Sequence, residues 1–248
     1  DAAIECARCI RSKLHAGDIW LRRYRDGDSR FAATLEDYAY LVEAIVHLYS
    51  ITGESEWLRY AEAIQDEQHE RLWNSDMQSY VASRSPKNIA EIREWHDGAT
   101  PSPNAVSLEN LLALSALTGE TRFSERAHAL EDGIPAEIAV NPSGYSRTLA
   151  AVVSRLTGSQ VCMVCPPDAA DTPPTAVFDL WRRFLPLTTV VWASQGSKPH
   201  GIAENKGPVD GQTSFYVCEN KTCHNPVVDV DGAVEVCLRA SKVRGLKA

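Results

Sequence analysis

Several common signals are missing from this 248-residue sequence. It has no run of about 18 apolar residues, which a membrane-spanning helix needs, and no charged, apolar and small-residue leader pattern. The 25 basic residues form no cluster and the net charge is −8, so a face for nucleic acid or anionic membranes is not expected. The loop at 165–174 lacks a glycine-rich phosphate-binding pattern.

Cysteine is scarce and irregularly spaced, with seven in the chain. This is not the framework of a disulfide-rich secreted domain, so we expect mostly free thiols, in the cytoplasm or another reducing compartment. Cys6 and Cys9 lie one helical turn apart and are expected to be buried as small hydrophobic side chains. Cys162 and Cys165 fall on opposite faces of a predicted strand, which argues against a redox pair.

Cys218, Cys223, His224 and Cys237 are the candidate zinc ligands, but the spacing of the first two is wide and no second CxxC accompanies them. A local disulfide is the alternative in an oxidising compartment. His47 lies near an apolar stripe and is expected to pack against it. We therefore predict neither a bound metal nor a cofactor.

The sequence does contain an internal repeat. Residues 41–64 align without a gap with residues 107–130, at an offset of 66. Both copies carry apolar residues at helical spacing and a Thr-Gly-Glu at the same place, and glycine readily takes the left-handed conformation that ends a helix. Each copy is thus predicted to be a helical hairpin. Residues 2–14 are expected to be the second helix of an earlier hairpin, which would make the chain a fragment.

Stacked hairpins that share a core build solenoids or closed α/α toroids. The stretches 19–34 and 71–103 are rich in Trp, Tyr and turn residues and are expected to form short strand-like ribbons. After about Pro142, predicted helices alternate with apolar strands, a pattern typical of a small α/β unit. The predicted fold is mainly α. An incomplete ring of toroid hairpins covers 1–141, and a closing helix, a small α/β appendage and a cysteine-containing tail cover 142–248.

The repeat also aligns two polar clusters, Glu36-Asp37-Tyr38 and Ser102-Pro103-Asn104. Each stands at the start of the first helix of a hairpin. In a toroid such helix ends gather at one rim, where free N–H groups and partial positive charge suit hydroxyls or a carboxylate. The sequence therefore predicts a pocket for a small polyhydroxylated ligand at this rim.

Eight residues are the candidate site. Glu36, Asp37 and Asp97 are the candidate catalytic carboxylates, since sugar chemistry commonly uses a carboxyl pair. Helix capping explains Glu36 and Asp37 equally well, and an Asx-turn explains Asp97. The candidate ligand-binding residues are Tyr38, Trp95, His96, Ser102 and Asn104. Trp95 is alternatively a core anchor and Asn104 a helix cap.

Three segments carry a resemblance to a known family. LEDYAYLVEAIVHLYSITGESEWL, WHDGATPSPNAVSLENLLALSALTGE and FYVCENKTCHNP closely resemble the YyaL/spermatogenesis-associated protein 20 family. The resemblance implies the C-terminal part of a protein that joins a thioredoxin-like domain to an α/α toroid of the six-hairpin glycosidase type. It also implies that this thioredoxin-like domain, in the same full-length chain, is a partner.

Two functions follow from these patterns. One is a carbohydrate-type toroid with isomerase, epimerase or hydrolase chemistry, and the other is a non-catalytic interaction domain that works with the thioredoxin-like module in redox or protein-quality roles. Sequence does not choose between them, because capping residues and pocket residues are of the same types at the same places.

Overall fold

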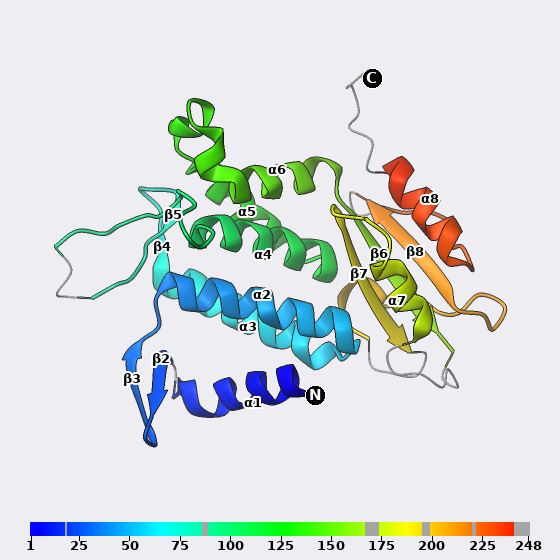
Figure 1. Cartoon of the computed structure of the whole chain (residues 1–248), viewed down its shortest axis with the longest axis horizontal. Coiled ribbons are helices and arrows are strands. Elements are labelled where there is room, and N and C mark those ends of the chain that lie inside the picture. The colour runs from blue at the N-terminus through cyan, green and yellow to red at the C-terminus, as the bar shows by residue number, and fades with distance from the viewer. Residues whose placement is uncertain (18, 86–88, 167–173, 195–198, 220–221, 241–248) are drawn as a thin grey trace.

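The computed structural model describes residues 1–17, 19–85, 89–166, 174–194, 199–219 and 222–240. Most of the loop at 165–174 and the tail at 241–248 lie outside them. Over the described residues the chain is mainly helical, with eight α-helices and three small sheets (Figure 1). Within the same ranges no helix combines the length and apolar character that crossing a membrane requires.

The chain opens with a helix and a small antiparallel ribbon. These are α1 (Ala2–Leu14), β1 (His15–Ala16), β2 (Ile19–Arg25) and β3 (Asp28–Ala32). The ribbon lies where the sequence predicts one, and the indole of Trp20 anchors it in the core.

The prediction for the first two cysteines is wrong, because Cys6 and Cys9 are both exposed. The inward stripe of α1 runs through Ile4, Ala7 and Ile10, which pack on the main core. Cys6 and Cys9 each precede a stripe residue by one position, and a one-residue step rotates a side chain by about 100° around a helix. They therefore point away from the core.

The first copy of the repeat forms α2 (Leu35–Thr52) and α3 (Ser55–Leu72), which pack against each other. Helix α2 ends at Gly53, whose φ of 68° is the left-handed conformation expected there. A Cβ at Gly53 would also lie 2.9 Å from Trp192, whose Nε1 donates a hydrogen bond to the Ile51 carbonyl at 3.1 Å. The end of α2 is thereby fixed against a strand far away in sequence.

The second copy forms α4 (Pro103–Thr118) and α5 (Thr121–Asp132), and α4 ends at Gly119 with a φ of 76°. Apolar residues at the same offset are buried in both copies: Val42 and Leu108, Ile45 and Leu111, Leu48 and Leu114, Trp57 and Phe123. The shared burial explains why the repeat pattern predicts the helices well.

Shorter elements link these helices. The two-stranded β4 (Trp73–Asn74) and β5 (Ser79–Tyr80) follow α3, and two 3₁₀ turns, η1 (Ala136–Ala139) and η2 (Pro142–Tyr145), lead into α6 (Ser146–Thr157). Helices α2, α4 and α6 lie side by side in that order, while α3 packs on α2 and α5 on α4 (Figure 1). The helices thus form two layers.

A four-stranded sheet follows, with strand order β7-β6-β8-β9. Its members are β6 (Ser159–Cys165), β7 (Thr188–Ser194), β8 (Ser214–Glu219) and β9 (Thr222–Cys223). Helix α7 (Thr175–Trp181) connects β6 to β7 along the chain. Strands β6 and β7 pair in parallel, whereas β8 runs antiparallel to β6. The predicted strand–helix–strand order is therefore present. The turn η3 (Gly201–Ala203) precedes β8, and α8 (Val230–Ala240) ends the described chain.

The sheet separates two apolar cores. One face, with Cys162 and Val164, packs into the same core as α2 and α4. The other face, with Met163 and Cys165, packs with α7 and α8. Alternation along β6 thus places the two cysteines on opposite faces, as predicted, and burial raises the pKa of Cys162 to about 12 and that of Cys165 above its ordinary value. Neither thiol has the character of a redox nucleophile.

Candidate functional site

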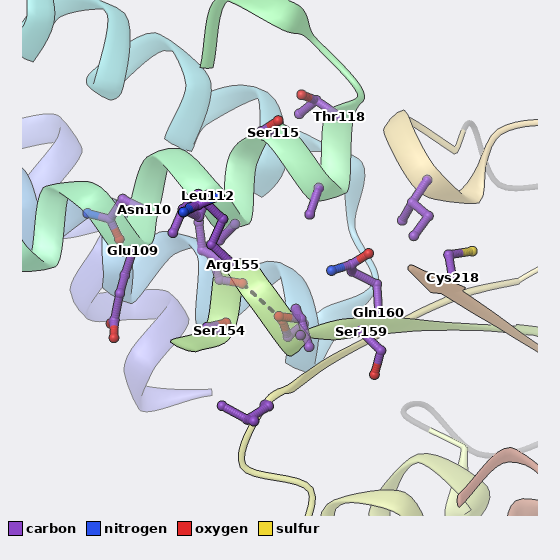
Figure 2. Close-up of a pocket in the computed structure, with 18 of the residues that line it drawn as sticks. Glu109, Asn110, Leu112, Ser115, Thr118, Ser154, Arg155, Ser159, Gln160 and Cys218 are labelled. Atoms are coloured by element: carbon purple, nitrogen blue, oxygen red, sulfur yellow. Dashed lines mark hydrogen bonds between the residues drawn. The ribbon is translucent and has the colours of Figure 1, made fainter. Parts of the chain in front are cut away.

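A pocket of about 760 Å³ lies between the helices and the sheet. Helices α2, α4 and α6 supply most of its lining, and α5, the starts of β6 and β7, the turn at η3 and the β8–β9 cysteines also contribute. Glu109 and Asn110 lie at one end, and Gln160 and Cys218 at the other (Figure 2). Its volume is within the range of small-molecule sites, roughly 300–1,000 Å³.

Helical periodicity explains which side chains reach this pocket. Glu43, His47 and Ser50 follow the spacing of one face of α2, while the opposite face of α2 is buried in the core. Helices α4 and α6 contribute Glu109 and Arg147 in the same way. His47 is exposed, so the prediction that it packs against the apolar stripe is wrong. It lies between buried Val46 and Leu48, one step outside the stripe.

Arg147 joins the two carboxylates that line the pocket at its Glu109 end. Its Nη2 donates to Oε1 of Glu43 and pairs with Oε2 of Glu109, so one guanidinium nitrogen holds two carboxylates from two helices. All three side chains are between 24% and 31% exposed, which leaves them reachable but partly shielded from water. Partial shielding strengthens such pairs relative to fully exposed ones.

Burial shifts the titration of this group. It raises the pKa of Glu109 above its ordinary value, Arg147 opposes the rise, and Glu43 and Asp97 add to it. Burial alone lowers the pKa of Arg147, but the carboxylates of Glu109 and Glu43 outweigh this and leave it raised. Glu109 therefore keeps its proton to higher pH than an ordinary glutamate, while Arg147 stays charged.

Sequence reasoning missed this trio, although the repeat contains a signal for two of its members. Glu43 and Glu109 stand at the repeat offset of 66, in the middle of equivalent helices. Arg147 lies beyond the aligned segments, and its approach becomes visible only in three dimensions.

The predicted rim residues of α2 lie outside the pocket lining. Asp37 accepts hydrogen bonds from the backbone N–H of Thr34 at 2.7 Å and from its hydroxyl at 2.8 Å, in a capping box. Tyr38 is buried and its hydroxyl donates to Glu67 at 2.8 Å. Glu36 is exposed. The capping interpretation thus describes the observed contacts of Asp37.

Asp97 connects two helix starts. Its Oδ1 accepts from the backbone N–H of Ser102 at 2.8 Å, and its Oδ2 accepts from the N–H of Arg147 at 2.8 Å and the hydroxyl of Ser146 at 3.1 Å. Its own N–H donates to the Gly144 carbonyl at 2.7 Å. Asp97 therefore fixes the start of α6 relative to α4, and with it the backbone that carries Arg147.

The rim residues Asn104 and Trp95 form buried hydrogen bonds at the start of α4. Asn104 is fully buried and donates to the carbonyls of Tyr80 and Glu94, both at 3.0 Å. Trp95 is buried and donates from Nε1 to the Ser79 hydroxyl at 3.0 Å.

The last two rim residues complete this loop. The Ser102 hydroxyl caps α4 by accepting from the N–H of Ala105 at 3.1 Å. His96 is exposed and stands edge-on to Tyr145, with ring centroids 5.6 Å apart. These contacts hold the loop, and ligand contacts by the rim residues stay predictions.

The candidate zinc ligands are not brought together. Cys218 and Cys223 form a disulfide, and His224 pairs with Glu219 at 3.0 Å. Cys237 belongs to α8 and is buried in the core on the other side of the sheet. Among the described residues no group of three or more His, Cys, Asp and Glu side chains is arranged to hold a metal. The disulfide also corrects the expectation of free thiols at two of the seven positions.

Fold and pocket together define a mainly helical protein of paired helices with a small sheet attached. No family model matches the chain. Human spermatogenesis-associated protein 20 is 28% identical over 216 residues, 79% of this chain and 26% of that protein, and the rat protein gives the same figures over 214 residues. An uncharacterised protein of Caenorhabditis elegans is 24% identical over 208 residues, 81% of this chain and 28% of its own.

The chain is a homologue of spermatogenesis-associated protein 20, and the match fits a C-terminal part of that family. It spans about a quarter of the length of these relatives.

Proposed function

We propose that the chain is part of a carbohydrate-type α/α toroid and that its pocket binds a small polyhydroxylated ligand. The observation that carries the proposal is the convergence of two repeat-related glutamates on Arg147 in a pocket of about 760 Å³. Carboxylates accept hydrogen bonds from sugar hydroxyls, and a guanidinium donates hydrogen bonds to the oxygens of the same kind of hydroxyl. A polyol is the ligand class that uses both.

The charges narrow this class. Two carboxyl groups surround one guanidinium, so the Glu109 end of the pocket carries no net positive charge, whereas Arg155 and Lys206 line other parts of it. A sugar acid would place a third carboxylate beside Glu43 and Glu109, at a cost in electrostatic repulsion. Neutral sugars and amino sugars are therefore the preferred ligands.

The pair also suits acid–base chemistry of the isomerase, epimerase or hydrolase type. Burial raises the pKa of Glu109, and a carboxyl that retains its proton is the kind that serves as a general acid. Glu43 contacts the same guanidinium nitrogen of Arg147 and is the candidate base. In this assignment Asp97 acts indirectly, by holding the backbone of Arg147.

The toroid itself is supported by the side-by-side order of α2, α4 and α6, each the first helix of a pair or the start of the next unit. The relatives are about four times longer than the matched part, which leaves ample chain for further helix pairs. Closure of a ring is accordingly assigned to the longer protein.

Calorimetric titration and thermal shift with neutral sugars, amino sugars and sugar acids would test the proposal on the full chain. A ligand at 100 times its Kd stabilises the folded state by about 2.7 kcal/mol, which raises the Tm by roughly 5–10 °C. Glu109→Gln and Glu43→Gln should each weaken binding by roughly tenfold or more, since hydrogen bonds to charged groups contribute about 1.5–3 kcal/mol.

Glu36→Gln is the matched control, because Glu36 lies on the exposed rim of the same helix as Glu43. Binding lost in Glu36→Gln and kept in Glu109→Gln would move the site to the rim. If no sugar binds, the pocket proposal fails and the interaction domain that works with a thioredoxin-like module becomes the better hypothesis.

A further inference from the structure

One wall of the pocket contains a disulfide that the proposed chemistry does not use. Cys218 on β8 and Cys223 on β9 are bonded, and both line the pocket, with Cys218 at the end away from Glu109 (Figure 2). The two residues differ in exposure, because Cys218 is only 3% exposed whereas Cys223 is exposed. Among the cysteines, all of which lie in the described ranges, only Cys218 and Cys223 form a disulfide and only they line the pocket.

This disulfide contributes little to the stability of the fold. It joins residues only five positions apart, and a cross-link that closes so short a loop removes little chain entropy from the unfolded state. Strand β8 is already held by its long antiparallel pairing with β6. Exposed disulfides of this kind belong to the labile, regulatory class.

The disulfide does control β9. This strand has two residues and pairs with β8 alone, through Cys218 with Cys223 and Glu219 with Thr222. One more backbone hydrogen bond follows, from the N–H of His224 to the Val217 carbonyl at 2.9 Å. Without the sulfur bond, these backbone contacts and the pairing of His224 with Glu219 at 3.0 Å would hold β9, and with it this part of the pocket wall.

We propose that Cys218–Cys223 is a thiol-exchange site built into the pocket wall, and that its redox state sets how firmly β9 closes that wall. A small thiolate attacks the Sγ of Cys223, the exposed residue of the pair, a mixed disulfide forms there, and Cys218 leaves as a thiolate. A second thiolate then attacks the sulfur of the bound small thiol, which releases the small-molecule disulfide and frees Cys223. Both cysteines take up a proton from water, so two thiols are oxidised as one protein disulfide is reduced.

Glutathione is the probe for the first test. The folded chain, with Cys6→Ser and Cys9→Ser to remove the exposed free thiols, is equilibrated with defined ratios of reduced to oxidised glutathione, alkylated and digested for mass spectrometry. The expected result is reversible reduction in native buffer, with glutathione trapped on Cys223 and at least tenfold less on Cys218. The buried Cys162 and Cys165 should stay unalkylated, which shows that the protein remained folded. Reduction only in denaturant, or glutathione mainly on Cys218, would overturn the proposal.

Hydrogen exchange supplies the second test, without any pocket ligand. Reduction should speed exchange of the His224 amide by tenfold or more and leave the amides of β6 unchanged. The double variant Cys218→Ser/Cys223→Ser should show the fast rate at all redox ratios while keeping a melting temperature within a few degrees of the parent. Equal His224 rates in both states would refute control of β9, and a large fall in melting temperature would identify the bond as structural.

The effect on ligand affinity rests on the proposed function, whereas the exchange chemistry does not. If a sugar binds, its affinity should fall severalfold on reduction. If none binds, the alkylation and exchange results still decide the redox proposal.

Discussion

The two copies of the repeat share their helix ends and differ at their helix starts. Thr52 and Thr118 each donate a hydroxyl hydrogen bond to a leucine carbonyl four residues earlier, at 2.8 and 2.7 Å, and each accepts from a glutamate N–H two residues later. Helix α2 begins with a half-buried capping box at Asp37. Helix α4 begins with the buried pair Pro103 and Asn104.

This difference separates two tasks within one pattern. The apolar positions and the glycine stops define the helices, and they are the same in both copies. The polar residues at the starts define what is attached to each helix. At α2 they satisfy the helix itself, and at α4 they hold the loop from Trp95 to Ser102, which reaches α6 through Asp97.

The largest effect should come from breaking the start of α4. Asn104→Ala removes bonds to Tyr80 and Glu94 at a fully buried site and leaves their partners unsatisfied, so we expect a loss of about 3 kcal/mol in the free energy of unfolding. Asp37→Ala, its counterpart at α2, should cost only about 1 kcal/mol, the usual value of a lost cap. Urea unfolding measures both. Equal losses would mean that the two starts do the same task.

The next effect concerns the link from α4 to α6. Asp97→Ala should reduce the free energy of unfolding by about 2 kcal/mol, because three donors at two helix starts lose their acceptor. Asp97→Asn is the isosteric control and should lose roughly half as much, since its amide oxygen still accepts from one side. A loss near zero for Asp97→Ala would show that the loop from Trp95 to Ser102 is not coupled energetically to α6.

The sequence predicted the helices because local pattern and burial agree. Ile45 and Leu111, or Trp57 and Phe123, occupy equivalent positions and are buried alike. Spacing along one chain is enough to find such pairs. The strand–helix–strand order after residue 142 follows from the same kind of local evidence, for example the near-complete burial of β6.

The site was harder to predict because its geometry is not local. Asp37 is predicted from a polar cluster at a helix start and Asp97 from a turn, yet both carboxylates accept hydrogen bonds from backbone N–H groups. The two pocket carboxylates, Glu43 and Glu109, come from mid-helix positions, where a glutamate on a solvated face is common and gives no signal by itself. Only packing of α6 beside α4 brings Arg147 to Glu43 and Glu109.

A smaller difference should appear at the two glycine stops. Gly119→Ala meets no atom within 4 Å and should cost about 1 kcal/mol, the strain of a left-handed alanine. Gly53→Ala carries the same strain and also drives its Cβ to 2.9 Å from Trp192, so we expect about 2 kcal/mol. The two melting curves give the difference directly. Equal losses of stability in the two variants would show that Trp192 moves away from the added Cβ at no cost in free energy.

The smallest effect is a pH dependence centred on Glu109. Burial raises its pKa in the folded state above the unfolded value of about 4.3. Its protonated form therefore contributes stability below pH 4.3, and this contribution is lost as pH rises through the folded pKa. The free energy of unfolding of the parent, relative to Glu109→Gln, should accordingly fall with rising pH across this window.

Carbon-13 NMR of the Glu109 carboxyl measures that pKa directly. Glu43→Gln removes a charge that raises it and should move the titration to lower pH, whereas Arg147→Gln removes an opposing charge and should move it to higher pH. The two shifts have opposite signs only if both residues face Glu109 in solution. Shifts of the same sign, or none, would mean that the equivalent glutamates of the two repeats do not share one arginine. The two copies would then be alike in their helices and not in a shared charged site.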